Sequence, residues 1–402
     1  METATRILCI AAVLALGGAP RQAAFAPFDD EDGNASAGLV IAPPNHAVQA
    51  ALTARSYAPG STATVALRGR ATGLTIRIFH AGAGHAGPLQ GTPVTGPVGR
   101  TFTVGRWPSG LYYADVTTPG RGDWYAPFVV RPKRLGEHRV AVVLPTNTWQ
   151  AYNFEDGDSW YHDASVHRID LSRPYVAGGV PPHYTGYDRG FIRWLTLEKR
   201  PVDFLTDDDL DRAAGAELAR AYDLVVFSGH EEYVTEHEFD ATQRYRDLGG
   251  NLAFLSANNF FYKVVKHGNT MDGRWRWRDL GRPEASLVGS QYVDWNHAKY
   301  ANQPYVAVGG WVFADTGLRD GATFGKYGIE VDATTSDSPK GTRVLAHIDN
   351  IFGHGVDAQM TYYTTPVGAK VFAAGVMNFG GSALWPVVTT MMENIWRNLS
   401  QP

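Results

Sequence analysis

The chain has 402 residues, 44% of them hydrophobic and 19% charged, so it can bury a sizeable core in two domains and is not a disordered protein. Its 36 basic and 40 acidic side chains give a formal charge of −4. No basic run occurs, which argues against nucleic acid or an anionic membrane surface as a partner.

The first 26 residues predict a signal peptide. Arg6 precedes the apolar run "ILCIAAVLALGGA", which is too short to stay in a bilayer as a spanning helix, and the small residues "RQAAFA" end at Ala26. The alternative is an apolar start that is no signal. Because Cys9 is the only cysteine, the mature chain would lack disulfides, a cysteine nucleophile and thiolate metal ligands. We therefore expect a secreted protein without a membrane span.

Two domains are expected after a linker over residues 27–39. Residues 40–133 contain short alternating segments such as "TATVALRG" and "GLYYADV", divided by glycine and proline, which is typical of an immunoglobulin-like β-sandwich. Residues 137–402 instead contain continuous apolar strands that end in small or polar residues: "RVAVVLP", "YDLVVFSG" and "GGNLAFLSANN". Such strands are typical of a parallel sheet that is covered on both faces.

Helical spacing lies between these strands, at residues 190–200 and 235–249. The second helix has Thr235 as a candidate N-cap and Glu238 three residues later, which predicts a capping box. The tail reads as paired strands over residues 361–381 and a closing helix over 385–399. Alternating strands and helices predict an α/β domain.

Three polar segments follow the predicted strands: "PTNTWQAYN", "SGHEEY" and "SANN". Because the carboxyl ends of parallel strands share one edge of a sheet, these segments should form one concave polar site. The histidines of "HEEYVTEH" are seven residues apart, so the helical zinc-protease motif is absent, and no Gly-x-Ser-x-Gly, P-loop or dinucleotide fingerprint occurs. The remaining oxygen and imidazole donors indicate a metal site with hard ligands.

Three further features have weaker interpretations. The acidic cluster "TDDDLD" (206–211) lacks the glycine and distal glutamate of a calcium loop, so we expect a strand-to-helix loop with capping side chains. The segment "GRWRWRD" (273–279) is either a surface strand or a pocket entrance with stacked cations and rings. Glu330 is expected to approach the pocket.

Many short motifs in order resemble the C-terminal domain family of the N,N-dimethylformamidase beta subunit. They include "NTWQAYN", "DSWY", "SRPY", "FIRWL", "VDFLTDDDLD", "GHEEY", "GGNLAFLSANNFFY" and "PEASLVGSQY". The resemblance spans roughly residues 40–400, including the predicted sandwich. We expect residues 137–402 to form an α/β layer sandwich, flavodoxin-like or class I glutamine amidotransferase-like, preceded by a small all-β sandwich that packs against its catalytic edge.

The resemblance implies one ferric iron held by two tyrosines and a glutamate. Carried over one position at a time, the ligands correspond to Tyr112 in "SGLYY", Tyr152 in "TWQAYN" and Glu232 in "GHEEY". The neighbouring catalytic positions correspond to His230, as proton shuttle, and Asn258 of "SANN", as oxyanion donor.

On this resemblance the chain is an exported iron-dependent hydrolase that cleaves a small amide or another C–N bond, with metal-bound hydroxide as the nucleophile. The alternative is a non-catalytic exported binding or structural module that keeps the fold. A small molecule is the expected substrate, and assembly into a homo-oligomer is left open.

Overall fold

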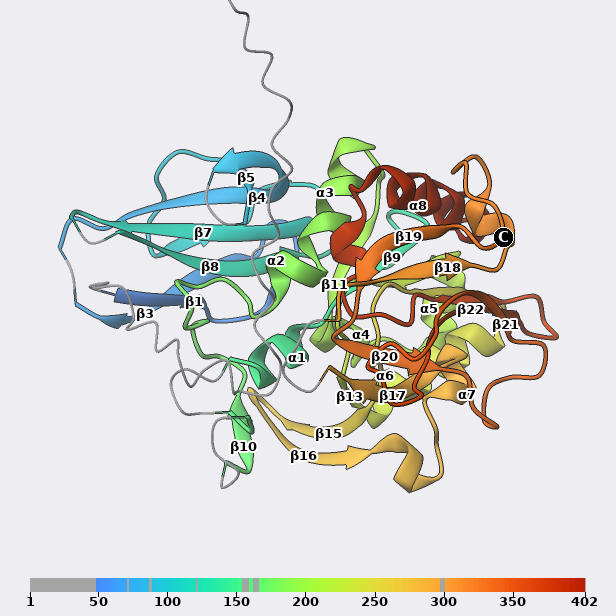
Figure 1. Cartoon of the computed structure of the whole chain (residues 1–402). Coiled ribbons are helices and arrows are strands. Elements are labelled where there is room, and N and C mark those ends of the chain that lie inside the picture. Colours follow the sequence, from blue (N-terminus) through green and yellow to red (C-terminus); the bar gives the residue numbers. More distant parts are fainter. Residues whose placement is uncertain are drawn as a thin grey trace, which may run out of the picture.

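The computed structural model describes residues 48–401, with gaps at 71, 87–88, 121, 154–158, 162–165 and 297–300. The predicted signal peptide and linker lie outside these residues. Figure 1 shows the early strands, in blue and cyan, at one end of the molecule and the C-terminus at the other. Among the described residues, no helix is both long and apolar enough to cross a bilayer.

The early strands form two sheets that share one apolar core. The three-stranded sheet has the order β1 (Val48–Leu52), β3 (Thr62–Gly69) and β6 (Thr101–Thr103). The five-stranded sheet has the order β2 (Ser56–Tyr57), β8 (Gly122–Val130), β7 (Gly110–Thr118), β4 (Thr75–Ala86) and β5 (Gly91–Pro93). Alternate residues of β7 and β8 enter the core between the sheets, as the period of two in a strand requires.

A nine-stranded sheet organises the rest of the chain. Its order is β11 (Asp203–Thr206), β9 (Val140–Leu144), β12 (Leu224–Phe227), β14 (Asn251–Phe254), β23 (Lys370–Ala373), β22 (Ala358–Thr364), β21 (Arg343–Ile348), β18 (Gln303–Ala307) and β19 (Thr323–Tyr327). The first five strands are parallel, and the remaining pairs are antiparallel. The predicted pairing of residues 361–381 is confirmed by the β22–β23 hairpin.

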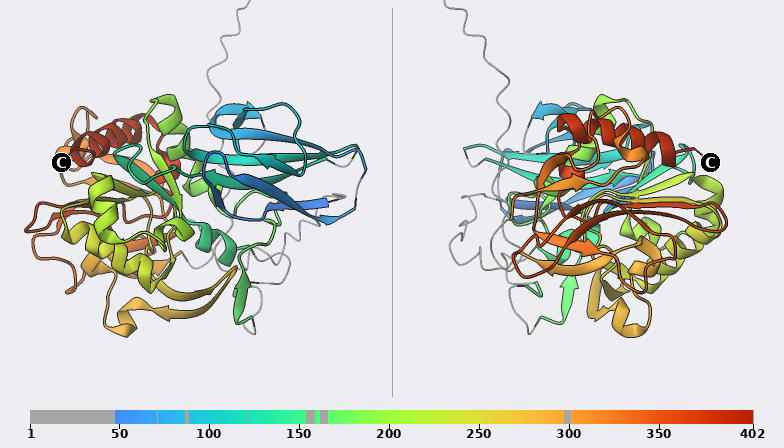
Figure 2. Two further views of the ribbon diagram at one scale, coloured as in Figure 1. Left: turned by 180° about the vertical axis from the view of Figure 1, so that it is seen from behind. Right: turned by 45° about the vertical axis from the view of Figure 1, so that its right-hand side comes forward.

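Helices cover both faces of the parallel part of this sheet. One face packs on α3 (Arg189–Leu197) and α8 (Pro386–Leu399), and the other packs on α5 (Gly215–Ala221) and α6 (Glu236–Asp247). Figure 2 shows α8, in red, apart from these last two helices. Strand β9 is buried along its whole length, which explains its unbroken apolar sequence.

The predicted flavodoxin-like or class I glutamine amidotransferase-like layer sandwich is wrong. Of the residues that the structure describes, 37% are in strands and 21% in helices, and the sheets are large, mixed and antiparallel. The prediction failed because it rested on the three most apolar strands. The strands between residues 291 and 364 are only partly buried, so their sequences carry a weaker signal.

The remaining strands form two smaller sheets. The four-stranded sheet has the order β10 (Arg168–Asp170), β16 (Thr270–Arg276), β15 (Tyr262–His267) and β13 (Tyr233–Thr235), and β17 (Gln291–Trp295) pairs with β20 (Glu330–Ala333). The remaining helices are short: α1 (Thr146–Ala151), α2 (Tyr184–Tyr187), α4 (Asp207–Leu210), α7 (Ala285–Val288), η2 (Trp277–Leu280), η3 (Trp311–Phe313) and η4 (Gly380–Ser382).

Capping boxes fix two strand-to-helix junctions near the carboxyl edge. At α6 the Thr235 hydroxyl accepts from the Glu238 N–H at 3.1 Å and the Glu238 carboxylate accepts from the Thr235 N–H at 2.6 Å, which confirms the predicted box. At α4 the same exchange joins Thr206 and Asp209, so "TDDDLD" is a capped helix start.

Candidate active site

The segment after β12 carries the first group of candidate residues. Ser228 and Gly229 follow the strand, and the next three residues lead into β13. A side chain at Gly229 would place its Cβ 2.3 Å from a carboxylate oxygen of Asp188, so only glycine fits beside that buried group. The chain can therefore turn closely enough to bring His230 and Glu232 under helix α1.

Glu232 lies at the centre of a buried cluster of tyrosines. Its Oε2 atom accepts a hydrogen bond of 2.8 Å from Tyr152, which ends helix α1, and one of 3.2 Å from Tyr161. The hydroxyls of Tyr161 and Tyr233 are also hydrogen-bonded to each other. Tyr152 and Tyr161 stack with ring centroids 4.2 Å apart. Three phenols and one carboxylate thus converge on one point.

The phenols act as neutral donors in this cluster. Burial and then the charge of Glu232 raise the pKa of Tyr161 well above its ordinary value, and the same two causes raise the pKa of Tyr233. A bound cation would favour the phenolate form instead, because its charge opposes both effects.

His230 is the imidazole nearest to the carboxylate. Its Nε2 atom lies 3.5 Å from Oε2 of Glu232 and 3.7 Å from Oε2 of Glu330, so the predicted approach of Glu330 to the pocket is confirmed. Burial and the nearby ring of His183 lower the pKa of His230 well below its ordinary value, opposed by the backbone of Asn258. Neither ring nitrogen makes a hydrogen bond of normal geometry within the described part of the chain. The lowered pKa favours the neutral form of the imidazole.

Asn258 lies in the turn after β14, where its backbone adopts a left-handed conformation with φ of 50°. Its N–H donates to Asp332 at 2.8 Å, which holds this turn in place. Its Oδ1 atom is buried and has no hydrogen-bond partner among the described residues. The side-chain oxygen could therefore accept a hydrogen bond from a molecule bound beside His230.

Tyr112 does not join this cluster. Its hydroxyl donates to the carbonyl of Pro108 at 2.9 Å, and its ring packs between the two sheets of the sandwich, 4.6 Å from the ring of His80. The neighbours Leu111 and Tyr113 face the other way, into the core shared with α3. Because side chains alternate along a strand, the inward placement of Tyr112 turns it away from the rest of the chain.

Sequence reasoning missed Tyr161 and Tyr233 as members of the cluster. Tyr161 ends "DSWY", a motif that carried the family resemblance but received no role, so membership of that motif was the available signal. Tyr233 ends "GHEEY" and continues directly into β13, so its sequence reads as an ordinary strand residue.

An arginine covers the outer side of the tyrosines. The guanidinium of Arg274 lies 5.6 Å from the ring centre of Trp160, 5.9 Å from that of Tyr161 and 5.6 Å from that of Tyr262. Arg274 is exposed, and it belongs to the segment "GRWRWRD". Residues 274–276 form the exposed end of strand β16, which agrees with the surface-strand interpretation, and Arg274 also provides the stacking of a cation on aromatic rings.

A small cavity of about 10 Å³ adjoins the cluster, which is room for about one water molecule. Eight residues line it: Thr148, Trp149, Tyr152, Pro182, His183, Tyr187, Asp188 and His230. A small polar molecule in this cavity would contact the imidazole of His230 and the ring of Tyr152.

Asp188 lines this cavity, and its raised pKa leads us to expect a folding stability that depends on pH. It accepts hydrogen bonds from Ser228 at 3.1 Å and Trp149 at 3.3 Å, and burial raises its pKa to about 7. Because the folded pKa exceeds the unfolded value, this group's contribution to stability is complete below about pH 4 and is lost as the pH rises to about 7. The whole change is at most about 4 kcal/mol.

We expect Asp188→Asn to flatten this dependence, because the neutral amide copies the protonated acid. Urea unfolding of the parent and the variant between about pH 4 and 8 measures it, with the exposed Asp337→Asn as the control. Parallel stability curves for the parent and Asp188→Asn would contradict the assignment.

The cluster fits a hard metal ion by the chemistry of its donors. Among the described residues, no three His, Cys, Asp or Glu side chains are grouped to hold a metal, so a site here requires tyrosine oxygens. Tyr152 and Tyr161 supply two phenol oxygens within hydrogen-bonding distance of one Glu232 carboxylate oxygen, and carboxylate and phenolate oxygens suit a hard cation.

Comparison with known proteins agrees with the resemblance in the sequence. The model of the family "N,N-dimethylformamidase beta subunit-like, C-terminal" matches residues 98–270 and 263–385. The N,N-dimethylformamidase beta subunits of Alcaligenes sp. and Paracoccus aminophilus are 34% and 32% identical to this chain over 95 residues. Each alignment covers 22% of this chain and 12% of the relative, so the match spans a small part of those subunits.

Among solved structures, a ThuA-like protein from Bacteroides uniformis aligns with 66% of this chain and 91% of its own. The sequences are 12% identical, and the TM-score is 0.38.

Proposed function

Because the chain belongs to the N,N-dimethylformamidase beta subunit-like C-terminal family, we propose that it is an exported, iron-dependent hydrolase of a small amide or another C–N bond. One observation carries the proposal: the Glu232 carboxylate accepts hydrogen bonds from the Tyr152 and Tyr161 hydroxyls at 2.8 and 3.2 Å, and it lies 3.5 Å from Nε2 of His230, which has no hydrogen bond of normal geometry among the described residues. This geometry supports Tyr161, in place of Tyr112, as the second tyrosine ligand.

Iron is proposed as a single ferric ion held by Tyr152, Tyr161 and Glu232. Two phenolates and one carboxylate would neutralise its three charges. When bound, a cation of this kind polarises an amide carbonyl and lowers the pKa of water. Around it, neutral His230 would take and return the proton, and Asn258 would orient the amide or hold the oxygen that gains charge.

Metal content of the purified protein tests this proposal directly. We expect about one iron per chain and a visible absorption band from the iron phenolate. Hydrolysis of formamides of increasing size should then fall with size, because the cavity beside His230 is small. If protein purified from cells supplied with iron contains no iron, the proposed cofactor is wrong. If N-terminal sequencing of protein from the native host finds Met1, the proposed export is wrong.

Paired phenylalanine variants test which tyrosine is the second ligand. We expect Tyr161→Phe to lose the visible band and most of the iron, because it removes a donor oxygen and keeps the ring that stacks on Tyr152. Tyr112→Phe should keep both, because its hydroxyl bonds to Pro108 inside the sandwich. Iron analysis and absorption spectra measure the two effects. Loss of iron from Tyr112→Phe alone would restore the ligand set that the sequence resemblance implied.

A non-catalytic binding module is the second candidate, favoured by the small size of the cavity, which holds about one water molecule. A module of this kind would bind a small polar compound without turning it over. Purified protein that contains iron and still fails to hydrolyse any formamide would favour the module over the enzyme.

A further inference from the structure

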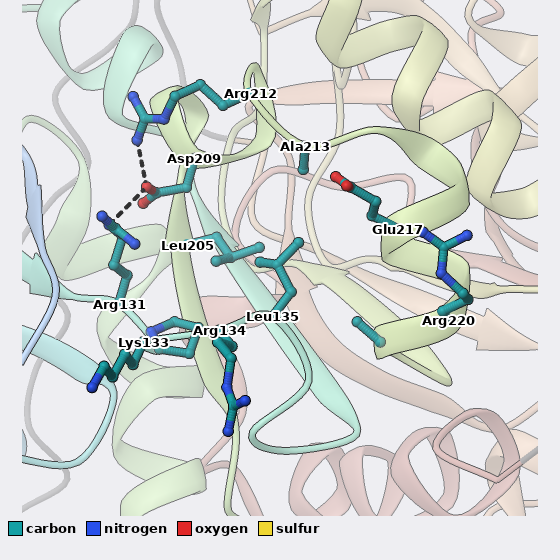
Figure 3. Close-up of a pocket in the computed structure, with 12 residues that line it drawn as sticks. Arg131, Lys133, Arg134, Leu135, Leu205, Asp209, Arg212, Ala213, Glu217 and Arg220 are labelled. Carbon is teal, nitrogen blue, oxygen red and sulfur yellow. Dashed lines mark hydrogen bonds and ion pairs between the residues drawn. The ribbon is translucent and has the colours of Figure 1, made fainter.

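A basic cleft lies away from the tyrosine cluster, and the proposed function gives it no role. It has a volume of about 570 Å³, and Figure 3 shows charged side chains around Leu135 and Leu205. Arg131, Lys133 and Arg134 come from the segment that follows β8, while Arg212 and Arg220 come from the region of α5. The floor is apolar and is formed by Leu135, Leu205, Ala213 and Ala221.

The lining has an excess of positive charge. Five basic and two acidic side chains line the cleft, which leaves three positive charges in excess, although the whole chain is formally negative. This local excess is unfavourable in the absence of a counter-ion, because like charges repel.

Both lining carboxylates are already used by the protein. Asp209 accepts from the Thr206 N–H at 3.0 Å in the capping box and from Ser56 at 2.9 Å, and Arg212 pairs with it at 2.6 Å. Glu217 accepts from the Ala214 N–H at 3.2 Å at the start of α5. Arg131 also pairs with Asp209, at 3.5 Å, so the negative charge of the two carboxylates holds helix starts and two arginines in place.

Three of the cations remain unpaired. Within the described ranges, the side chains of Lys133, Arg134 and Arg220 form no ion pair, and all three are exposed. The turn that presents the first two is fixed, because the Glu137 carboxylate accepts from their backbone N–H groups at 3.0 and 3.3 Å. The cations are thus held around the cleft by the backbone and not by a partner.

We infer that this cleft binds a small polyanion of the organic phosphate class. Guanidinium groups present planar forks of N–H donors that match phosphate oxygens, and a lysine adds a point charge. The apolar floor suits the carbon part of such a molecule, and the volume lies in the range of small-ligand sites. The inference does not depend on the proposed hydrolase activity.

Titration calorimetry with inorganic pyrophosphate, in buffers matched for ionic strength with sodium chloride, tests this site. We expect one pyrophosphate per chain and weaker binding as salt is added. The double variant Lys133→Glu/Arg134→Glu should weaken binding at least about tenfold, since a hydrogen bond to a charged group contributes more than a neutral one. Arg220→Glu, on the opposite wall, should act in the same direction.

The matched control is Arg68→Glu/Arg70→Glu, which changes the net charge equally at exposed positions of the sandwich. It should bind pyrophosphate within about twofold of the parent. Equal weakening of pyrophosphate binding in both double variants would show that the effect depends on net charge alone, and it would overturn the site. Absence of pyrophosphate binding to the parent protein would also overturn the site. Pyrophosphate also chelates iron, so the titration is repeated with Glu232→Gln. Binding that disappears in that variant would overturn the cleft as the site.

Discussion

Glu232→Gln is expected to abolish iron binding and amide hydrolysis together. The carboxylate is the acceptor on which the Tyr152 and Tyr161 hydroxyls converge, and it would be one of three anionic ligands. A neutral amide oxygen in its place leaves the charge of the ion uncompensated. Loss of an ion that polarises the carbonyl corresponds to about three orders of magnitude in rate. Iron analysis and turnover of the same sample measure both effects.

The neighbouring Glu231→Gln is the matched control. Burial and then Asp207 raise the pKa of Glu231 well above its ordinary value, which favours the protonated acid that glutamine copies. We expect the control to keep its iron and most of its activity. Full iron occupancy and unchanged turnover in Glu232→Gln would refute the site, and the cluster would then be only a well-packed strand end.

His230→Gln should separate rate from metal binding. The imidazole lies 3.5 Å from Glu232 and contributes no ligand in our assignment, so iron content should be unchanged. The turnover number should fall by about 10²–10⁴, the usual contribution of a general acid or base, with a smaller change in KM. Steady-state kinetics and iron analysis of one preparation measure this pattern.

A histidine in the same cavity provides the comparison for that result. His183 stacks on Tyr187 and lies in a left-handed backbone conformation, with φ of 59°, that asparagine tolerates. His183→Asn should therefore reduce turnover less than His230→Gln. If His230→Gln instead loses its iron, the imidazole is a ligand and the tyrosine and glutamate set is incomplete.

The sequence predicted the local features of this fold well. The capping box of α6 could be read from Thr235 and Glu238 alone, because it needs only two side chains three residues apart. The buried strands β9, β12 and β14 were equally clear, since each is a continuous apolar run. Beyond the β22–β23 hairpin, the antiparallel extension of the sheet was missed because pairing between distant segments leaves no pattern within a short window.

The candidate site shows the same limit. His230 and Glu232 belong to one short motif, and Tyr152 ends the helix that follows the first buried strand, so their meeting could be anticipated from topology. The choice between Tyr112 and Tyr161 as the second tyrosine ligand could not be anticipated in this way. It depends on which face of β7 a residue occupies and on the path of the chain after α1, and neither is recorded in residue type or spacing.

The alternation along β7 also bears on how such a protein can be divided. Even-numbered residues of the strand fill the sandwich, while Leu111 and Tyr113 enter a core together with Tyr184 and Phe191 from the other half. One strand therefore belongs to two interiors. Cleavage of the chain in the segment after β8 would expose apolar surface to water on both fragments. We therefore expect the two halves to fold as one unit, and either half transferred to another protein would need a replacement for the apolar surface that it loses.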